Sequence, residues 1–144
     1  WPINVHVTEG LNQAHDAYIK TPFDDYLELA IHFPELKIIL AHWGGGIPFF
    51  EQNPKIKAAL KNVYYDTAAS PLLYSMDVFK NTLNLVGAEK VIFGSDFPLR
   101  LYPKIAEEPN MHRYIEAIEN AGLSKENQVA IFRNTISSVL ELPN

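Results

Sequence analysis

Four short apolar runs, at residues 1–7, 36–41, 63–67 and 90–95, constrain the fold of this chain more than any other feature. Their starts lie about 25–35 residues apart, which is the spacing that a strand, a crossover helix and the next parallel strand need. The second run is apolar almost throughout, as in parallel strands that are covered on both faces. The pattern therefore predicts an α/β fold in which a parallel sheet has helices packed outside it.

Helical signals fill the segments between these runs and follow the last one. One helical face is expected from residues at helical spacing after the first run, which are Phe23, Tyr26, Leu27, Ala30 and Ile31. Three hydroxyl residues are expected to cap helices, namely Thr21, Ser75 and Ser124. A further helix is expected at 47–60, with an interruption near Asn53-Pro54. The strand–helix unit thus occurs four times, which fits either an open doubly wound sheet or half of a (β/α)8 barrel.

Size and composition exclude several classes of protein. The 144 residues are enough for a real core, and we expect residues 1–144 to fold as a single domain. The net charge of −5 and the absence of a Lys/Arg cluster argue against a nucleic-acid partner. The sequence has no cysteine, which excludes disulfides and thiolate metal sites. No apolar run approaches the roughly 20 residues of a membrane span and no signal peptide is visible, so we expect no membrane partner and a cytoplasmic location.

Three of the strand-like runs end in side chains of catalytic type, which are His6, His42 and Asp96. His42 stands before Trp43 and three glycines, residues 44–46, where a strand gives way to a loop. Because the carboxyl ends of parallel strands share one edge, the three side chains are expected to project to the same face. Two imidazoles and a carboxylate suit a divalent metal of the zinc type, which would activate a bound water or polarise a substrate oxygen.

Each of these residues also has a non-catalytic interpretation. His6 and His42 could be satisfied polar groups, and Asp96 could cap the loop at Phe97-Pro98. Asp66, at the end of the third run, is expected to make turn hydrogen bonds. The separations of 36 and 54 residues between the three candidates follow no local spacing rule, so the metal hypothesis depends on their shared place at strand ends.

The glycines at 44–46 allow a second hypothesis. A strand, a glycine turn and a helix can hold a phosphate at the helix N-terminus, and Asp66 lies about 20 residues on, where a ribose-binding acid would stand. The dinucleotide fingerprint fails, however, because its third glycine would fall on Phe49. Pro48 also removes an amide donor from the first turn, so dinucleotide binding ranks below the metal site.

The same residues carry a resemblance to a known family. The strand ending in Val5-His6, the segment His42–Gly46 and the segment Gly94–Pro98 are similar to motifs of the amidohydrolase-related metal-dependent hydrolases. The branch that they resemble also contains aminocarboxymuconate-semialdehyde decarboxylase and related aromatic-acid decarboxylases. The resemblance covers nearly the whole chain but only the C-terminal half of the family's barrel, so the four strands look like strands five to eight of a (β/α)8 barrel.

The resemblance implies roles for individual residues. His6 and Asp96 match metal ligands of the family, and Asp96 can also shuttle a proton. His42 matches a histidine that assists water or substrate activation and need not bind the metal. The metal is usually zinc and sometimes manganese, so Zn²⁺ is the first expectation. Arg100, shortly after the last strand, could pair with a carboxylate of a small-molecule substrate.

The resemblance also implies what this chain lacks. The family's first strand supplies an H-x-H pair to the metal, and no H-x-H occurs in this sequence. We therefore expect the chain to need an upstream half or to form a homodimer, and its start in a strand at Trp1-Pro2 also indicates an internal piece. The expected activity of the intact protein is hydrolysis of a C–O or C–N bond through metal-activated water. The alternatives are decarboxylation of a small aromatic or unsaturated carboxylic acid, and a non-catalytic half-barrel that self-associates.

Overall fold

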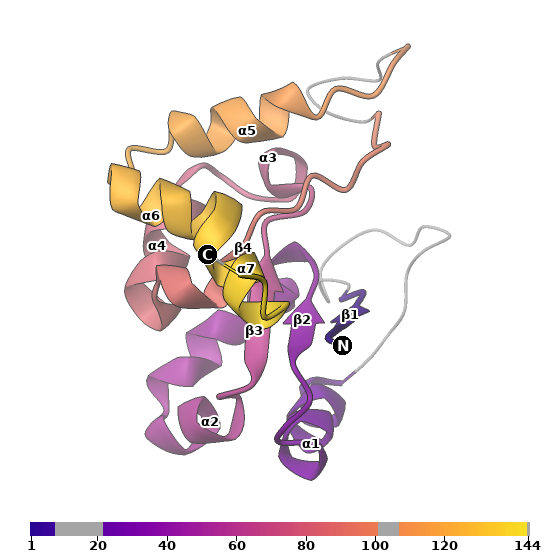
Figure 1. Cartoon of the computed structure of the whole chain (residues 1–144), viewed down its shortest axis with the longest axis vertical. Helices are drawn as coiled ribbons and strands as arrows, with labels where there is room; N and C mark the ends of the chain where they lie inside the picture. The colour runs from indigo at the N-terminus through magenta and orange to yellow at the C-terminus, as the bar shows by residue number, and fades with distance from the viewer. Residues whose placement is uncertain (8–21, 101–106, 144) are drawn as a thin grey trace.

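The strands form one parallel sheet whose spatial order is the order of the sequence (Figure 1). The computed structural model describes residues 1–7, 22–100 and 107–143. The strands are β1 (Ile3–Val5), β2 (Ile38–Leu40), β3 (Val63–Asp66) and β4 (Val91–Ile92). All three pairings are parallel, so the predicted α/β fold with parallel strands is confirmed. A doubly wound sheet reverses its strand order at a switch point, whereas this sheet does not, which favours the barrel alternative.

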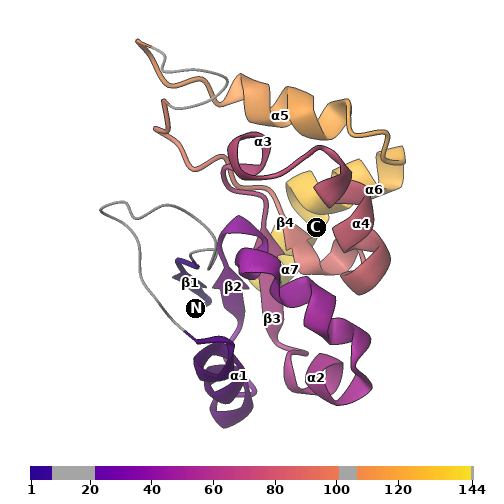
Figure 2. The ribbon, with the colours of Figure 1, turned by 180° about the vertical axis from the view of Figure 1, so that it is seen from behind.

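Helical segments connect the strands and follow the last of them. They are α1 (Phe23–His32), η1 (His42–Gln52), α2 (Pro54–Ala59), α3 (Ser70–Leu73), α4 (Asp77–Val86), η2 (Ala88–Lys90), α5 (His112–Glu119), α6 (Lys125–Val129), η3 (Ala130–Asn134) and α7 (Thr135–Val139). In both views α1 and α2 lie at one end of the molecule and α5 lies at the other (Figure 1 and Figure 2). Among the helices of the described residues, none is both long and apolar enough to cross a membrane.

The helix ends follow the sequence signals in most places. Ser124 caps α6 as predicted, since its hydroxyl accepts a hydrogen bond from Asn127 N at 3.2 Å. The interruption at Asn53-Pro54 is also confirmed, because α2 begins at Pro54 after η1 has ended. The cap predicted at Ser75 is wrong: α4 begins at Asp77, and the residue before it is Met76. Met76 already has helical angles in a turn closed by the bond from Val78 N to Ser75 O. The cap expected at Thr21 lies outside the described residues.

Both faces of the sheet are covered, which explains why the second apolar run does not alternate. Ile38 of β2 packs in the main core with Tyr26 of α1 and Phe79 of α4. Ile39 points to the opposite side, where it packs in a smaller cluster with Val139 of α7. Successive residues of a strand face opposite sides, so a run that is apolar at every position matches a sheet buried on both faces.

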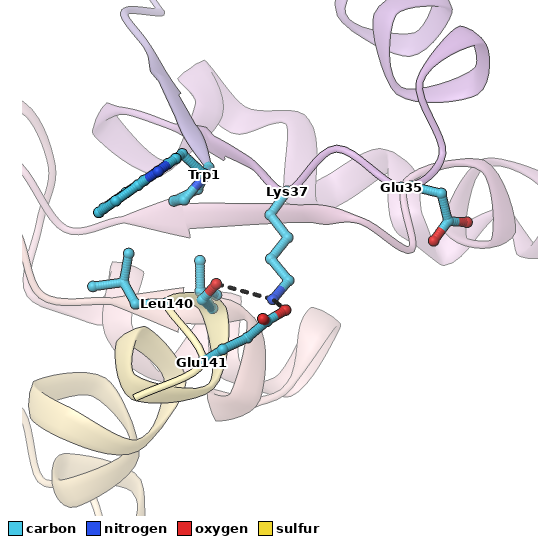
Figure 3. A pocket seen from close by; sticks show the side chains of 7 residues that line it. Trp1, Glu35, Lys37, Leu140 and Glu141 are labelled. Atoms are coloured by element: carbon cyan, nitrogen blue, oxygen red, sulfur yellow. Dashed lines mark hydrogen bonds and ion pairs between the residues drawn. The ribbon is translucent and has the colours of Figure 1, made fainter. Parts of the chain in front are cut away.

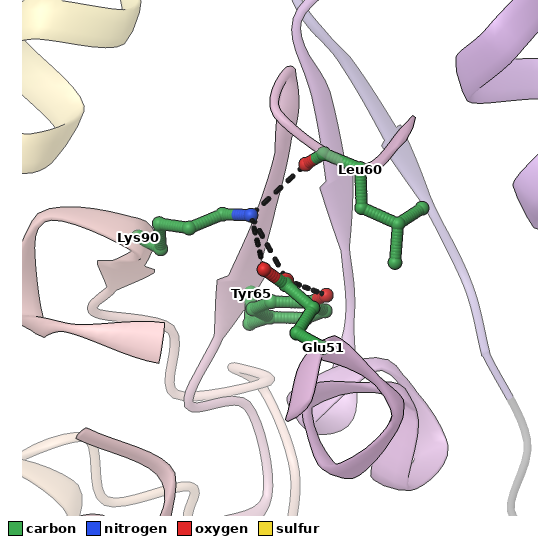
Figure 4. A network of polar contacts seen from close by, with 4 residues as sticks. All are labelled: Glu51, Leu60, Tyr65 and Lys90. Atoms are coloured by element: carbon green, nitrogen blue, oxygen red, sulfur yellow. Dashed lines mark hydrogen bonds and ion pairs between the residues drawn. The ribbon is translucent and has the colours of Figure 1, made fainter. Parts of the chain in front are cut away.

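A buried ion pair joins η1 to the segment before β4 (Figure 4). Lys90 Nζ lies 2.9 and 3.0 Å from the two carboxylate oxygens of Glu51 and also donates to Leu60 O at 2.9 Å. The hydroxyl of Tyr65 donates to the same carboxylate at 2.5 Å. The Glu51 side chain is 0% exposed and that of Lys90 is 13% exposed. Burial raises the pKa of Tyr65 far above its usual range, with the Glu51 charge adding to the effect, and burial lowers the pKa of Lys90.

Candidate functional site

Two imidazoles meet at the carboxyl ends of β1 and β2. His42 Nε2 lies 3.3 Å from His6 Nδ1, and the two rings meet edge to face with centroids 5.0 Å apart and planes at 82°. His42 is buried, whereas His6 is exposed at the edge strand of the sheet. The structure thus brings two of the three candidates together, as their shared place at strand ends predicted.

The turn after β2 has an uncommon backbone. His42 and Trp43 have φ values of 56° and 57°, and Gly44 continues the left-handed run at 58°. The left-handed conformation costs about 1–2 kcal/mol for a residue with a side chain, so His42 and Trp43 are held there by their surroundings. Gly44 is required for a second reason, since a Cβ at this position would lie 3.0 Å from the Tyr65 ring.

Side chains from the next loop hold this turn in place. The indole Nε1 of Trp43 donates to Ser70 Oγ at 2.7 Å, and that hydroxyl donates to Thr67 O at 2.6 Å. The hydroxyl of Tyr74 donates to the carbonyl of His42 at 3.2 Å. The sequence analysis assigned no role to Ser70 or Tyr74, because nothing local in the sequence links residues about 30 positions apart.

Asp66, the last residue of β3, accepts hydrogen bonds from both sides of the site. Its Oδ1 accepts from His42 N at 2.8 Å and from Ala68 N at 3.0 Å, so the expected turn hydrogen bonds are confirmed. Its side chain also forms a hydrogen bond with that of Asn4 in β1. Burial raises the pKa of Asp66, and the hydrogen bonds from Ala68 and His42 oppose that rise. One buried carboxylate therefore links β1, the turn after β2 and the loop after β3.

The same loop fixes the tautomer of His42. Its Nδ1 lies 3.1 Å from the carbonyl oxygen of Ala68. A carbonyl oxygen can only accept, so Nδ1 carries a proton in this contact. In the neutral ring Nε2 is then the basic nitrogen, and it is the atom that faces His6.

The end of β4 packs against the end of β3 through Gly94. The backbone N–H and carbonyl of Gly94 both bond the Thr67 hydroxyl at 3.0 Å, and a Cβ on Gly94 would lie 3.2 Å from the Asp66 carboxyl carbon. Asp96 follows two residues later, exposed and with a φ of 60°. In its non-catalytic interpretation Asp96 caps the loop at Phe97-Pro98. The N–H of Phe97 instead donates to the Ser95 hydroxyl at 3.2 Å, so this contact gives no support for a cap by the Asp96 side chain. Arg100 is exposed.

These donors fit part of a divalent-metal site. Imidazole nitrogens and carboxylate oxygens are both ligands that a divalent metal of the zinc type takes, and His6 and Asp96 offer one of each. The ring nitrogens of His6 and His42 are 3.3 Å apart, which is a hydrogen-bonding distance, so a base at His42 would stand directly beside a ligand at His6. Within residues 1–7, 22–100 and 107–143, however, no group of three His, Asp or Glu side chains is arranged to hold a metal ion. The described part of this chain therefore supplies only a portion of such a site.

A separate pocket lies away from these strand ends (Figure 3). It has a volume of about 300 Å³, and among the residues that line it are Trp1, Glu35, Lys37, Leu140 and Glu141. Lys37 directly precedes β2, so the pocket opens at the amino ends of the strands, opposite His42. Parallel-strand enzymes carry their chemistry at the carboxyl ends, so this pocket is not part of the candidate site.

Comparison with known proteins agrees with the resemblance of the sequence to the amidohydrolase-related metal-dependent hydrolases. A family model described as amidohydrolase matches residues 1–142. Among solved structures, the chain is similar to 5-carboxyvanillate decarboxylase from Sphingomonas paucimobilis, with 17% identity and a TM-score of 0.62, over 83% of this chain and 39% of that one. It is also similar to 2,6-dihydroxybenzoate decarboxylase from Rhizobium, with 19% identity and a TM-score of 0.63, over 98% and 51%. No curated protein matches the chain.

A third similar structure contains a metal ion. The dihydroxybenzoic acid decarboxylase from Polaromonas sp. JS666 was crystallised with manganese and the inhibitor 2-nitroresorcinol, and it shares 20% identity with a TM-score of 0.61, over 81% of this chain and 38% of that one. The chain spans between about two fifths and a half of these structures. They are (β/α)8 barrels, so the predicted half-barrel architecture is confirmed and the doubly wound alternative is excluded.

Proposed function

The chain belongs to the amidohydrolase family, and from that premise we propose that it forms the C-terminal half of a metal-dependent (β/α)8 decarboxylase. The substrate class is a small aromatic or unsaturated carboxylic acid. The observation that carries this proposal is the pair of imidazoles of His6 and His42, 3.3 Å apart on adjacent strand ends inside the matched region. The similar structures support decarboxylation over hydrolysis, since all three described above are decarboxylases.

We propose that this half contributes His6 and Asp96 as ligands to a divalent metal and that the other ligands come from the missing half. Manganese is supported by the Polaromonas structure, and the mixed imidazole and carboxylate donors also suit zinc. A metal bound at these residues would supply a Lewis acid that polarises a substrate oxygen.

The residues of this chain would have separate tasks in the reaction. Decarboxylation breaks the bond between the carboxylate carbon and its neighbour, leaves the electron pair on that neighbour and replaces the lost CO2 with a proton. We assign delivery of that proton to Asp96, whose exposed side chain can be reached by a substrate. His42 presents its basic Nε2 beside His6, and the exposed Arg100 pairs with the substrate carboxylate.

Hydrolysis is the second candidate, and one feature of His42 favours it. Because Nδ1 donates to Ala68 O, the neutral ring keeps Nε2 available as a base that could take a proton from water. The products separate the two reactions, since a decarboxylase releases CO2 and a hydrolase adds the elements of water to its substrate.

The partner that completes the barrel is a further part of the proposal. The chain spans 39% of the Sphingomonas structure and 51% of the Rhizobium structure, which supports an upstream half, covalently joined or separate. A second copy of this chain is the alternative. Closure would also cover β1, whose residues Ile3 and Asn4 are exposed at the edge of the sheet.

The test is an assay of the completed barrel, loaded with Mn²⁺, on hydroxybenzoates. The proposal predicts CO2 release matched by loss of the acid, and loss of that activity in Asp96→Asn. Glu35→Gln is the matched control, because it also removes the charge of an exposed carboxylate, but Glu35 precedes β2 and so lies at the amino ends of the strands, away from the candidate site. No CO2 from any acid, or full activity in Asp96→Asn, would refute the proposal.

A further inference from the structure

Asp66 is a buried acid that the proposed chemistry does not use. It is 6% exposed and stands at the end of β3, one strand away from the strand that carries His42. A buried carboxylate is expensive unless its oxygens are hydrogen-bonded, so its place here calls for a reason. Its hydrogen-bond partners supply that reason. One N–H group that Asp66 accepts is that of His42 itself, and the other is that of Ala68, whose carbonyl oxygen bonds the His42 ring.

One oxygen fixes both attachments of that ring. Oδ1 of Asp66 accepts the N–H of His42, which is the first residue of the left-handed turn, at 2.8 Å. The same oxygen accepts the N–H of Ala68, whose carbonyl receives the proton of His42 Nδ1. The backbone of His42 and the loop that orients its imidazole are thereby tied to a single atom.

The residues around Asp66 pack closely against its carboxyl group and leave water little access to its hydrogen bonds. The absence of a side chain on Gly94 lets the end of β4 approach the Asp66 carboxyl group, since a Cβ there would stand 3.2 Å away. The hydrogen bond with Asn4 holds the carboxylate on the β1 side. His42 itself is 7% exposed, so water has little access to its attachments.

We propose that Asp66 is a positioning residue that locks His42 as the Nδ1–H tautomer, with Nε2 directed at His6. This inference rests on the proposed function only for the catalytic role of His42. The lock itself is a property of this chain and needs neither metal nor substrate. A hydrogen bond of this kind matters for catalysis because the tautomer decides which nitrogen can act as a base.

The test is the tautomer of His42 in the chain labelled with ¹⁵N-histidine, read from long-range proton–nitrogen correlation spectra. His42 is assigned by loss of its signals in His42→Gln. The wild type is expected to show the Nδ1–H form alone. Asp66→Ala is expected to lose it and to give the mixture seen when the same chain is unfolded in urea. Asp66→Asn is expected to retain the Nδ1–H form, because its amide oxygen can accept both N–H groups.

Ser70→Ala is the matched control for general loosening of the turn. It breaks the bond that Trp43 Nε1 makes to a buried hydroxyl but leaves Asp66 intact, so the Nδ1–H form should persist. A folded Asp66→Ala chain that keeps the single tautomer would overturn the inference, as would equal loss in Ser70→Ala. If Asp66→Ala does not fold, the wild type still decides: a through-bond coupling from the His42 amide to the Asp66 carboxyl carbon supports the lock, and its absence refutes it. These spectra do not depend on activity. A chain that lacks decarboxylase activity would therefore refute the proposed function and leave the test of the His42 tautomer unaffected.

Discussion

Removal of the Lys90 ammonium group should destabilise the fold strongly, and much more than removal of the ammonium group of Lys37. In Lys90→Met, the Glu51 carboxylate keeps the Tyr65 hydroxyl but loses the two contacts at 2.9 and 3.0 Å to Lys90 Nζ. The Glu51 side chain is 0% exposed, so water cannot replace the lost partner. Breaking a buried pair by removing one member costs about 3–5 kcal/mol, because the remaining charge is left uncompensated.

The assay is urea unfolding followed by circular dichroism. With a cost of about 4 kcal/mol and a denaturant slope of about 2 kcal/mol per M, the unfolding midpoint of Lys90→Met should fall by about 2 M. The double variant Lys90→Met/Glu51→Gln should recover part of that loss, since Gln can still accept from Tyr65 but carries no charge.

Lys37→Met is the matched control. Lys37 also bonds one carboxylate, that of Glu141 at 2.8 Å, and the carbonyls of Ser138 and Val139, but its side chain is 30% exposed and that of Glu141 is 82% exposed. Solvent-screened pairs contribute little, so its midpoint should shift far less. Equal shifts for the two lysine variants, or no recovery in the double variant, would refute the argument from burial.

Three further predictions concern the same fold. The pKa of Tyr65 is raised in the folded state from its ordinary value of 10.0, so the unfolded chain loses this proton first as the pH rises. The stability of the wild type should therefore fall relative to that of Tyr65→Phe above about pH 10. Urea unfolding of both chains across that range checks the prediction, and parallel curves of stability against pH would contradict it. Ser124→Ala should lower the free energy of unfolding by about 1 kcal/mol through loss of the α6 cap, and an unchanged value would show that the cap contributes nothing. Gly44→Ala should destabilise more than Gly46→Ala, because both positions have positive φ but only a Cβ at 44 meets the Tyr65 ring, at 3.0 Å; equal thermal midpoints would argue against that contact.

The sequence was sufficient to predict the sheet and the meeting of the two histidines. Apolar runs at regular spacing identify the strands, and parallel strands carry their carboxyl ends to one edge whatever the loops between them do. The proximity of His6 and His42 follows from that geometry, although 36 residues separate them. The doubly wound alternative could not be dismissed at that level, because strand spacing alone does not reveal the order of strands in the sheet.

The features that the sequence did not reveal depend on tertiary contacts. The left-handed backbone of His42 and Trp43 goes against local preference, since residues with side chains rarely adopt it. The hydrogen bond from His42 N to Asp66 joins residues 24 positions apart, and the ion pair of Lys90 joins residues 39 positions apart. Glu51 lies in the segment 47–60, for which the sequence predicts only a helix, and the packed structure alone shows that its side chain is buried.

The most direct test of the account is the metal stoichiometry of the completed barrel that contains this chain, measured by elemental analysis after dialysis. We expect about one divalent metal ion per barrel, with loss of the metal in His6→Ala and in Asp96→Ala and retention in His32→Ala. One firmly bound metal ion in all three variants would contradict it, because the ligands would then lie elsewhere. A folded barrel that binds no metal would contradict it as well.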